Sequence, residues 1–172
     1  AQSQAIGVPL VTGKVTWETY EQVFKELVSG LKKRGVKGCV FGDVWVAEHK
    51  EWTERICNEL GIKALSPLFG EKPEDLFREL VNLGFEALVV TVKKEYLGEE
   101  WLGRKLDQEF LEELLEAKKN REIDVLGELG EYHTFVCDGP MFKKRIQILE
   151  THKVSKNGYA YLEINRFKLI DK

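Results

Sequence analysis

The sequence predicts an α/β protein, in which helices cover a parallel sheet and a small, mainly β part follows. Apolar runs suited to strands alternate with helix-like stretches through the first half of the chain, with short connections between them. Strands and helices in that order form βαβ units, whose strands pair in parallel. Near the C-terminus, Asn157-Gly158 separates two further runs, which is a strong signal for a β-hairpin.

Four short apolar runs are the expected strands of the parallel sheet. They are residues 8–11, 36–41, 62–65 and 87–92. Each is bounded by glycine or polar residues, and the run at 87–92 is almost unbroken, as in a strand buried on both faces.

Three helices are expected between these strands. Thr16 is expected to cap the first helix, and Trp17 begins its inward stripe. The second helix carries His49 and Trp52, which lie three residues apart and therefore share a face, where packing is favoured over ligand binding. Pro73 suits the first turn of the third helix, and Asp107 is expected to cap a further helix that follows the sheet.

Composition excludes several classes of function. The chain has 172 residues, 43% of them hydrophobic, enough for one core and a small second domain. A net charge of −3 with both signs interspersed argues against DNA binding, and no apolar run approaches the length of a membrane span. Cys39, Cys57 and Cys137 form no CxxC pair and the histidines lack ligand spacing, so we expect no metal site and a reduced, cytoplasmic protein.

The carboxyl ends of the strands are the expected binding edge of the sheet. This places Gly42-Asp43 and residues 66–70 at the edge. Neither segment is a Walker loop or a dinucleotide fingerprint, and a Gly-Asp pair after a strand is common.

Residues 127–140 are the stretch most suited to a functional site, because they contain three acids, one histidine and three glycines. The glycines permit positive φ and close approach to a ligand. The acids would meet the histidine on a bend, a grouping that suits ligand recognition or proton transfer, whereas the alternative is a glycine-rich turn with solvated acids. The candidates are Gly127, Glu128, Gly130, Glu131, His133 and Thr134.

Four blocks together resemble a known family. They are Gly42-Asp43 with His49 and Trp52, then residues 67–70, 97–104 and 127–140. Their order and spacing are similar to those of the diphthine–ammonia ligase family, which are PP-loop ATP pyrophosphatases. The resemblance implies the Rossmann-like HUP (adenine nucleotide α-hydrolase-like) fold.

The resemblance implies ATP-dependent, AMP-forming amide synthesis in diphthamide biosynthesis. The family adenylates the carboxylate of diphthine, a modified histidine of elongation factor 2, and ammonia displaces AMP. ATP and Mg²⁺ are the implied cofactors, and elongation factor 2 bearing diphthine and ammonia are the implied partners. The alternatives are a non-catalytic binding module and a related ATP pyrophosphatase that acts on another substrate.

Matching positions give the implied site residues. The residues that the resemblance implies for nucleotide binding are Gly42, Asp43, Gly70 and Arg104. Those implied for substrate binding are Trp101, Gly103, Gly127, Gly130 and Thr134. Those implied for catalysis are Glu131, Glu128 and His133. Of the two glutamates, Glu131 is favoured as the carboxylate that orients ammonia or takes its proton.

One family block is missing. The phosphate-binding loop Ser-Gly-Gly-Lys-Asp-Ser does not occur in residues 1–172, and we expect it upstream. Residues 1–93 would then be the C-terminal portion of the nucleotide-binding α/β domain, and residues 94–172 a substrate-facing subdomain with a helix and a β-hairpin. Because a partial sheet leaves strand edges unpaired, we expect the missing N-terminal half or self-association to complete it.

Overall fold

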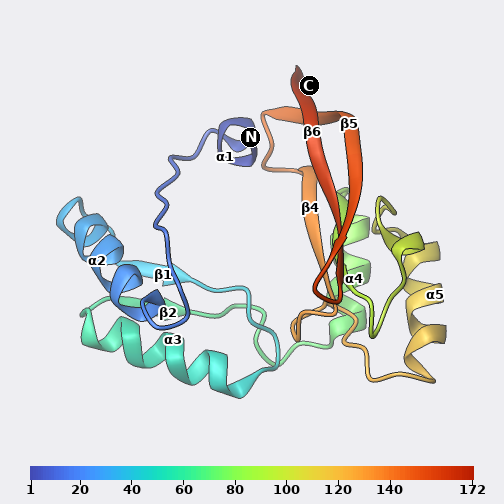
Figure 1. Cartoon of the computed structure of the whole chain (residues 1–172). Coiled ribbons are helices and arrows are strands. Elements are labelled where there is room, and N and C mark those ends of the chain that lie inside the picture. The colour runs from blue at the N-terminus through green and yellow to red at the C-terminus, as the bar shows by residue number, and fades with distance from the viewer. The chain divides into compact units, whose positions relative to one another are not determined.

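The computed structural model describes residues 1–172 as a mixed α/β chain with two compact units (Figure 1). Unit 1 comprises Ala1–Pro9 and Lys72–Lys172, and unit 2 comprises Leu10–Glu71. The boundary expected between residues 93 and 94 therefore falls inside unit 1. None of the helices is both long and apolar enough to cross a bilayer.

Unit 2 is built on a small parallel sheet. β1 (Gly38–Val40) pairs in parallel with β2 (Lys63–Leu65), and α3 (Ala47–Glu59) connects them. Figure 1 shows α3 running beside the two strands, with α2 (Tyr20–Lys33) preceding β1. This βαβ unit was expected from the alternating apolar runs, although both strands are shorter than expected.

Two predictions for the segment before α2 are wrong: the strand at residues 8–11 and the helix cap at Thr16. Residues 8–11 form no strand, and their apolar side chains are exposed. Thr16 does not cap α2, because its backbone N–H donates to Thr19 Oγ1 (2.9 Å) in a turn, and the helix begins only at Tyr20. Trp17 therefore lies outside the helix and is 94% exposed.

Unit 1 contains an antiparallel sheet with the strand order β4-β3-β6-β5. The strands are β3 (Glu86–Lys93), β4 (Tyr132–Asp138), β5 (Lys144–Lys156) and β6 (Tyr159–Asp171). The expectation that residues 87–92 extend the parallel sheet is wrong, because β3 pairs antiparallel with β4 and β6. A continuous apolar run marks a central strand but does not distinguish parallel from antiparallel pairing.

The predicted C-terminal hairpin is confirmed and is longer than expected. Asn157 (φ 53°) and Gly158 (φ 80°) both adopt positive φ, as a two-residue type I′ turn requires. Figure 1 shows β5 and β6 as long, adjacent strands. The short helix α1 (Gln2–Ile6) contacts β5, and its Ala5 joins a small buried cluster there.

The main core of unit 1 includes side chains from α4 (Pro73–Asn82) and α5 (Gln108–Lys118). Phe77 stacks on Phe110 with ring centroids 5.8 Å apart. Asp107 caps α5 by accepting the N–H of Phe110 at 2.8 Å. The predicted cap at Asp107 and the predicted first-turn position of Pro73 are thus confirmed.

Part of the segment at 97–104 belongs to this core. It contains the 3₁₀ helix η1 (Glu99–Trp101). Leu97, Trp101 and Leu102 are buried in the core, because the chain then returns along β3, where the Gly103 N–H donates to the Val89 carbonyl at 2.9 Å. Irregular backbone is stable here because the neighbouring strand satisfies its hydrogen bonds.

Candidate functional site

Residues 124–131, called the acidic turn below, hold two buried carboxylates. Glu131 is 1% exposed, and its Oε1 accepts the N–H of Asp124 at 2.7 Å. Asp124 Oδ2 in turn accepts the N–H of Glu128 at 2.8 Å. Glu131 Oε2 is buried and has no hydrogen-bond partner, which is costly for a carboxylate oxygen and rare in folded proteins.

Both glycines of the acidic turn adopt positive φ, as the sequence suggested. A Cβ on Gly127 (φ 71°) would lie 2.8 Å from the Tyr132 carbonyl oxygen, so the close approach is to the protein's own backbone. A Cβ on Gly130 (φ 84°) would meet open space. The role of either glycine in substrate binding stays a prediction.

The side chains of Glu131 and His133 do not interact, although the sequence suggested that the acids and the histidine would meet on one bend. His133 and Thr134 are exposed on β4, whereas Glu131 is buried, and no hydrogen bond or ion pair connects Glu131 with His133. Tyr132 between them is buried, and its hydroxyl donates to the Val125 carbonyl. Burial raises the pKa of Tyr132 well above its ordinary value, and the carboxylates of Asp124 and Glu131 raise it further.

Arg104 and Trp101, by contrast, are in contact. The guanidinium lies 4.8 Å from the Trp101 ring centroid, and its Nη2 donates to Glu113 Oε1 at 2.8 Å. The hydrogen bond with Glu113 raises the pKa of Arg104. An incoming phosphate would have to compete with Glu113 for this guanidinium.

The remaining predicted residues lie in unit 2, beyond the carboxyl ends of β1 and β2. Asp43 lines a cavity of about 550 Å³, called the aromatic cavity below. Its Oδ1 lies 3.3 Å from His49 Nδ1. Gly70, whose N–H donates to the Val44 carbonyl at 2.7 Å, and Gly42 are not among the lining residues.

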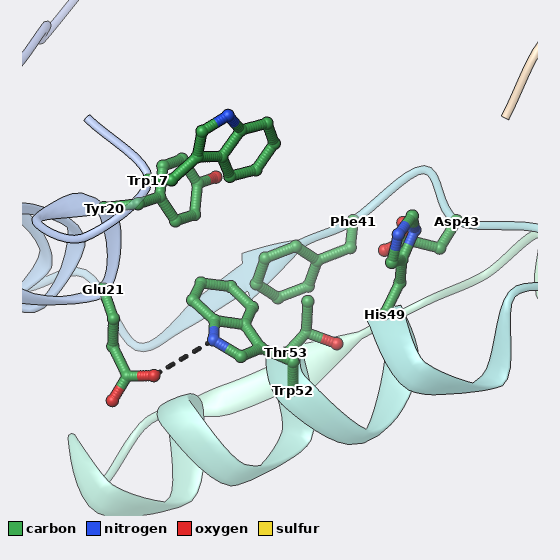
Figure 2. A pocket seen from close by; sticks show the side chains of 8 residues that line it. All are labelled: Trp17, Tyr20, Glu21, Phe41, Asp43, His49, Trp52 and Thr53. Carbon is green, nitrogen blue, oxygen red and sulfur yellow. Dashed lines mark hydrogen bonds and ion pairs between the residues drawn. The ribbon is translucent and has the colours of Figure 1, made fainter. Parts of the chain in front are cut away.

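Aromatic rings dominate the lining of this cavity (Figure 2). The lining residues are Trp17, Tyr20, Glu21, Phe41, Asp43, His49, Trp52 and Thr53. Trp52 Nε1 donates to Glu21 Oε2 at 3.1 Å, and the Tyr20 and Trp52 ring centroids are 5.6 Å apart. The expected packing of Trp52 is therefore confirmed, although the same side chain also lines the cavity.

Glu21 is held by cations that lie outside the aromatic cavity. Its carboxylate pairs with Arg55 at 2.7 Å and with Lys25 at 2.7 Å. The hydrogen bond from Arg55, followed by that from Lys25, lowers the pKa of Glu21 to about 2. Glu21 therefore stays ionised and fixes the Trp52 indole across most of the pH range.

The cavity fits ATP only in part. Its rings suit a flat base, but its lining includes two carboxylates and no lysine or arginine to accept a triphosphate. The structure also has no group of three or more His, Cys, Asp or Glu side chains that could hold a metal ion.

Sequence reasoning missed part of both sites. Glu21 and Phe41 of the aromatic cavity belong to segments that only the fold brings together, and nothing local to either residue signals a site. Asp124 precedes the glycines that drew attention to residues 127–140. Asp124 stands between the apolar residues Ile123 and Val125, and this position could have indicated that its carboxylate is buried with them.

Two family models match most of the chain. A family model described as the diphthamide synthase C-terminal domain matches residues 72–170, and one described as the diphthamide synthase N-terminal domain matches residues 1–64. The chain belongs to the diphthine–ammonia ligase (diphthamide synthase) family. The two matched segments follow the division into unit 1 and unit 2 closely, apart from the first residues.

The chain is similar to curated proteins that carry the name diphthine–ammonia ligase. The protein of Mus musculus is 30% identical over 176 residues, which covers 96% of this chain and 66% of the relative. That of Homo sapiens is 28% identical over 159 residues, covering 92% and 59%. That of Schizosaccharomyces pombe is 36% identical over 113 residues, covering 64% and 18%. The chain thus spans less than two thirds of the length of these relatives.

Proposed function

We propose that this chain takes part in ATP-dependent, AMP-forming amide synthesis, with diphthine on elongation factor 2 as the acid and ammonia as the amine. Family membership across both units supports the proposal. The parallel pair β1–β2 would belong to a Rossmann-like HUP sheet of the nucleotide-binding domain. The lining of the aromatic cavity does not suit a triphosphate, and the residue roles in this proposal concern the amine and the protein substrate.

The observation that carries the proposal is the unpartnered Oε2 of Glu131. A buried carboxylate oxygen gains most from an N–H donor, and amide synthesis with ammonia brings a small one. Glu131 Oε1 is held by the Asp124 N–H, so that the carboxylate has a fixed orientation. It would orient ammonia and take up a proton as the C–N bond forms.

The acidic turn gives its two glutamates different tasks in this proposal. Glu131 would be the catalytic carboxylate, and Glu128, which is half-buried and donates its backbone N–H to Asp124, would contact the substrate. His133 and Thr134, exposed on β4, would contact the protein substrate. Arg104 would act only if the substrate displaced Glu113.

The test is formation of AMP by the purified chain with ATP, ammonium and elongation factor 2 that carries diphthine. The proposal predicts AMP that depends on all three components and matches the amide formed, measured by chromatography and mass spectrometry. If the chain forms no AMP when all three components are present, the proposal is contradicted.

A second candidate is a non-catalytic module that binds the modified factor without ATP chemistry. The acidic lining of the aromatic cavity, which does not suit a triphosphate, favours it. Binding of the factor without AMP formation would support this module and exclude the ligase. AMP formation with a different acid would indicate a related ATP pyrophosphatase.

A further inference from the structure

Two of the three cysteines lie against each other in unit 2. Cys39 is the central residue of β1, and Cys57 lies near the C-terminal end of α3. A side-chain hydrogen bond joins their two thiol groups. Neither cysteine takes part in a disulfide bond in the structure, so both thiols are free to react. The fold therefore brings together two thiols that are far apart in the sequence and form no CxxC pair.

The geometry of the βαβ unit explains why these thiols meet. Successive side chains of a strand lie on opposite faces of the sheet. Val40 is 70% exposed whereas Cys39 is half-buried, so Cys39 lies on the face of β1 that is turned toward α3. Cys57 is 1% exposed and shares the buried side of α3 with Thr53 and Ile56. The pair thus connects the inner face of the strand with the inner face of the helix.

The two thiols differ in how readily a dissolved reagent reaches them. Cys39 is partly accessible to solvent, whereas Cys57 is almost fully covered. Burial raises the pKa of the Cys57 thiol, and the neighbouring Cys39 side chain raises this pKa further. A covered thiol with a raised pKa reacts poorly with a reagent from outside. Cys39 is therefore the residue that an external disulfide meets first, and Cys57 is the neighbour that can resolve the product.

We propose that Cys39 and Cys57 are a redox modification site, at which a low-molecular-weight disulfide produces an intramolecular disulfide bond. The Cys39 thiolate attacks one sulfur of the reagent RSSR, and one RS⁻ leaves and takes up a proton. The Cys57 thiolate then attacks the Cys39 sulfur of this mixed disulfide, and the second RS⁻ leaves. Two protein thiols are oxidised to one disulfide bond while one RSSR is reduced to two RSH. An excess of a dithiol reverses both steps.

The new bond ties together two elements that line the aromatic cavity. Phe41 follows Cys39 by two residues, and Thr53 lies one helical turn before Cys57. A covalent link between β1 and α3 therefore restrains the spacing of these two lining residues. The link also closes a loop in the unfolded chain, which stabilises the folded state. The inference concerns the two thiols and does not depend on the proposed ligase activity.

The experiment treats the full chain with oxidised glutathione, alkylates the remaining thiols in denaturant, and maps the disulfide bonds by mass spectrometry of unreduced peptides. We expect one intramolecular linkage, between Cys39 and Cys57, which dithiothreitol removes. Cys137 is 6% exposed and lies in unit 1, so it should be recovered in the alkylated form. A mixed glutathione disulfide that persists at Cys39, or free thiols at both residues, would overturn the proposal.

Three single variants assign the linkage and the order of attack. Cys57→Ser should stop the reaction at the mixed disulfide on Cys39, whereas Cys39→Ser should remain unmodified. Cys137→Ser is the matched control and should oxidise like the unaltered chain. Circular dichroism checks that each variant is folded.

Thermal unfolding measures whether the bond restrains the fold. Oxidation should raise the melting temperature of the unaltered chain and of Cys137→Ser by about 5 °C or more, and should leave that of Cys39→Ser unchanged. Equal melting temperatures of the oxidised and reduced unaltered chain would contradict a link between β1 and α3. An inactive chain that forms the bond would refute only the ligase proposal, and an active chain that does not form it would refute only this inference.

Discussion

Unit 1 and unit 2 hold their helices by different forces. In unit 1, α4 and α5 contribute to a core of fully buried side chains that includes Phe77 and Phe110. In unit 2, α2 and α3 are joined by the ion pairs Glu21–Arg55 and Lys25–Glu59, which are partly exposed, and by partly exposed rings.

The buried core of unit 1 and the exposed ion pairs of unit 2 surround two different kinds of candidate site. The core of unit 1 includes Ile123, Val125 and Tyr132, within and beside the acidic turn, where Glu131 keeps one buried oxygen without a hydrogen-bond partner. Exposed ion pairs stabilise a fold only weakly. In unit 2 they leave the aromatic rings uncovered, and these rings line an open cavity.

The largest effect is expected in the core of unit 1. Phe110→Ala removes a ring that contacts Phe77, Trp101 and Tyr132, and it should lower the free energy of unfolding by about 3–5 kcal/mol in urea titrations. Leu129→Ala, at a side chain 60% exposed, should change it by less than about 0.5 kcal/mol. Equal effects of the two substitutions would mean that this core does not stabilise unit 1.

A smaller effect separates the two glycines of the acidic turn. Gly130→Ala should cost about 1–2 kcal/mol, because alanine disfavours positive φ. Gly127→Ala should cost at least about 1 kcal/mol more, because its Cβ would also lie 2.8 Å from the Tyr132 carbonyl. Thermal unfolding of both variants measures the difference, and equal melting temperatures would show that the turn is not packed as described.

The smallest effect concerns the ion pairs of unit 2. The pKa of Glu21 is lowered from 4.5 to about 2, so its contribution to stability is complete above pH 4.5 and is lost as the pH falls toward 2. Tryptophan fluorescence should therefore report loosening of Trp52 in that range. Glu21→Gln should remove this transition, whereas Glu26→Gln on the same helix should keep it. A transition that persists in Glu21→Gln would assign it to another group.

Sequence reasoning was most successful where local chemistry determines structure. The Asn157-Gly158 turn, the Asp107 cap and the positive φ of Gly127 all follow from the residue itself. It failed for residues 87–92, because an apolar run does not specify the direction of its partner. The aromatic cavity and the hydrogen bond between Asp124 and Glu131 depend on tertiary packing, so the local sequence around these residues does not predict them.

The most direct test of the account is the ammonium dependence of AMP formation in Glu131→Gln and Glu128→Gln. Glutamine can still accept the Asp124 N–H but cannot take a proton, so Glu131→Gln should keep the melting temperature within a few degrees. It should also lose about a hundredfold in kcat/KM for ammonium. Glu128→Gln should show a clearly smaller loss. The opposite order, or equal small losses, would contradict the assignment of the buried carboxylate to the amine.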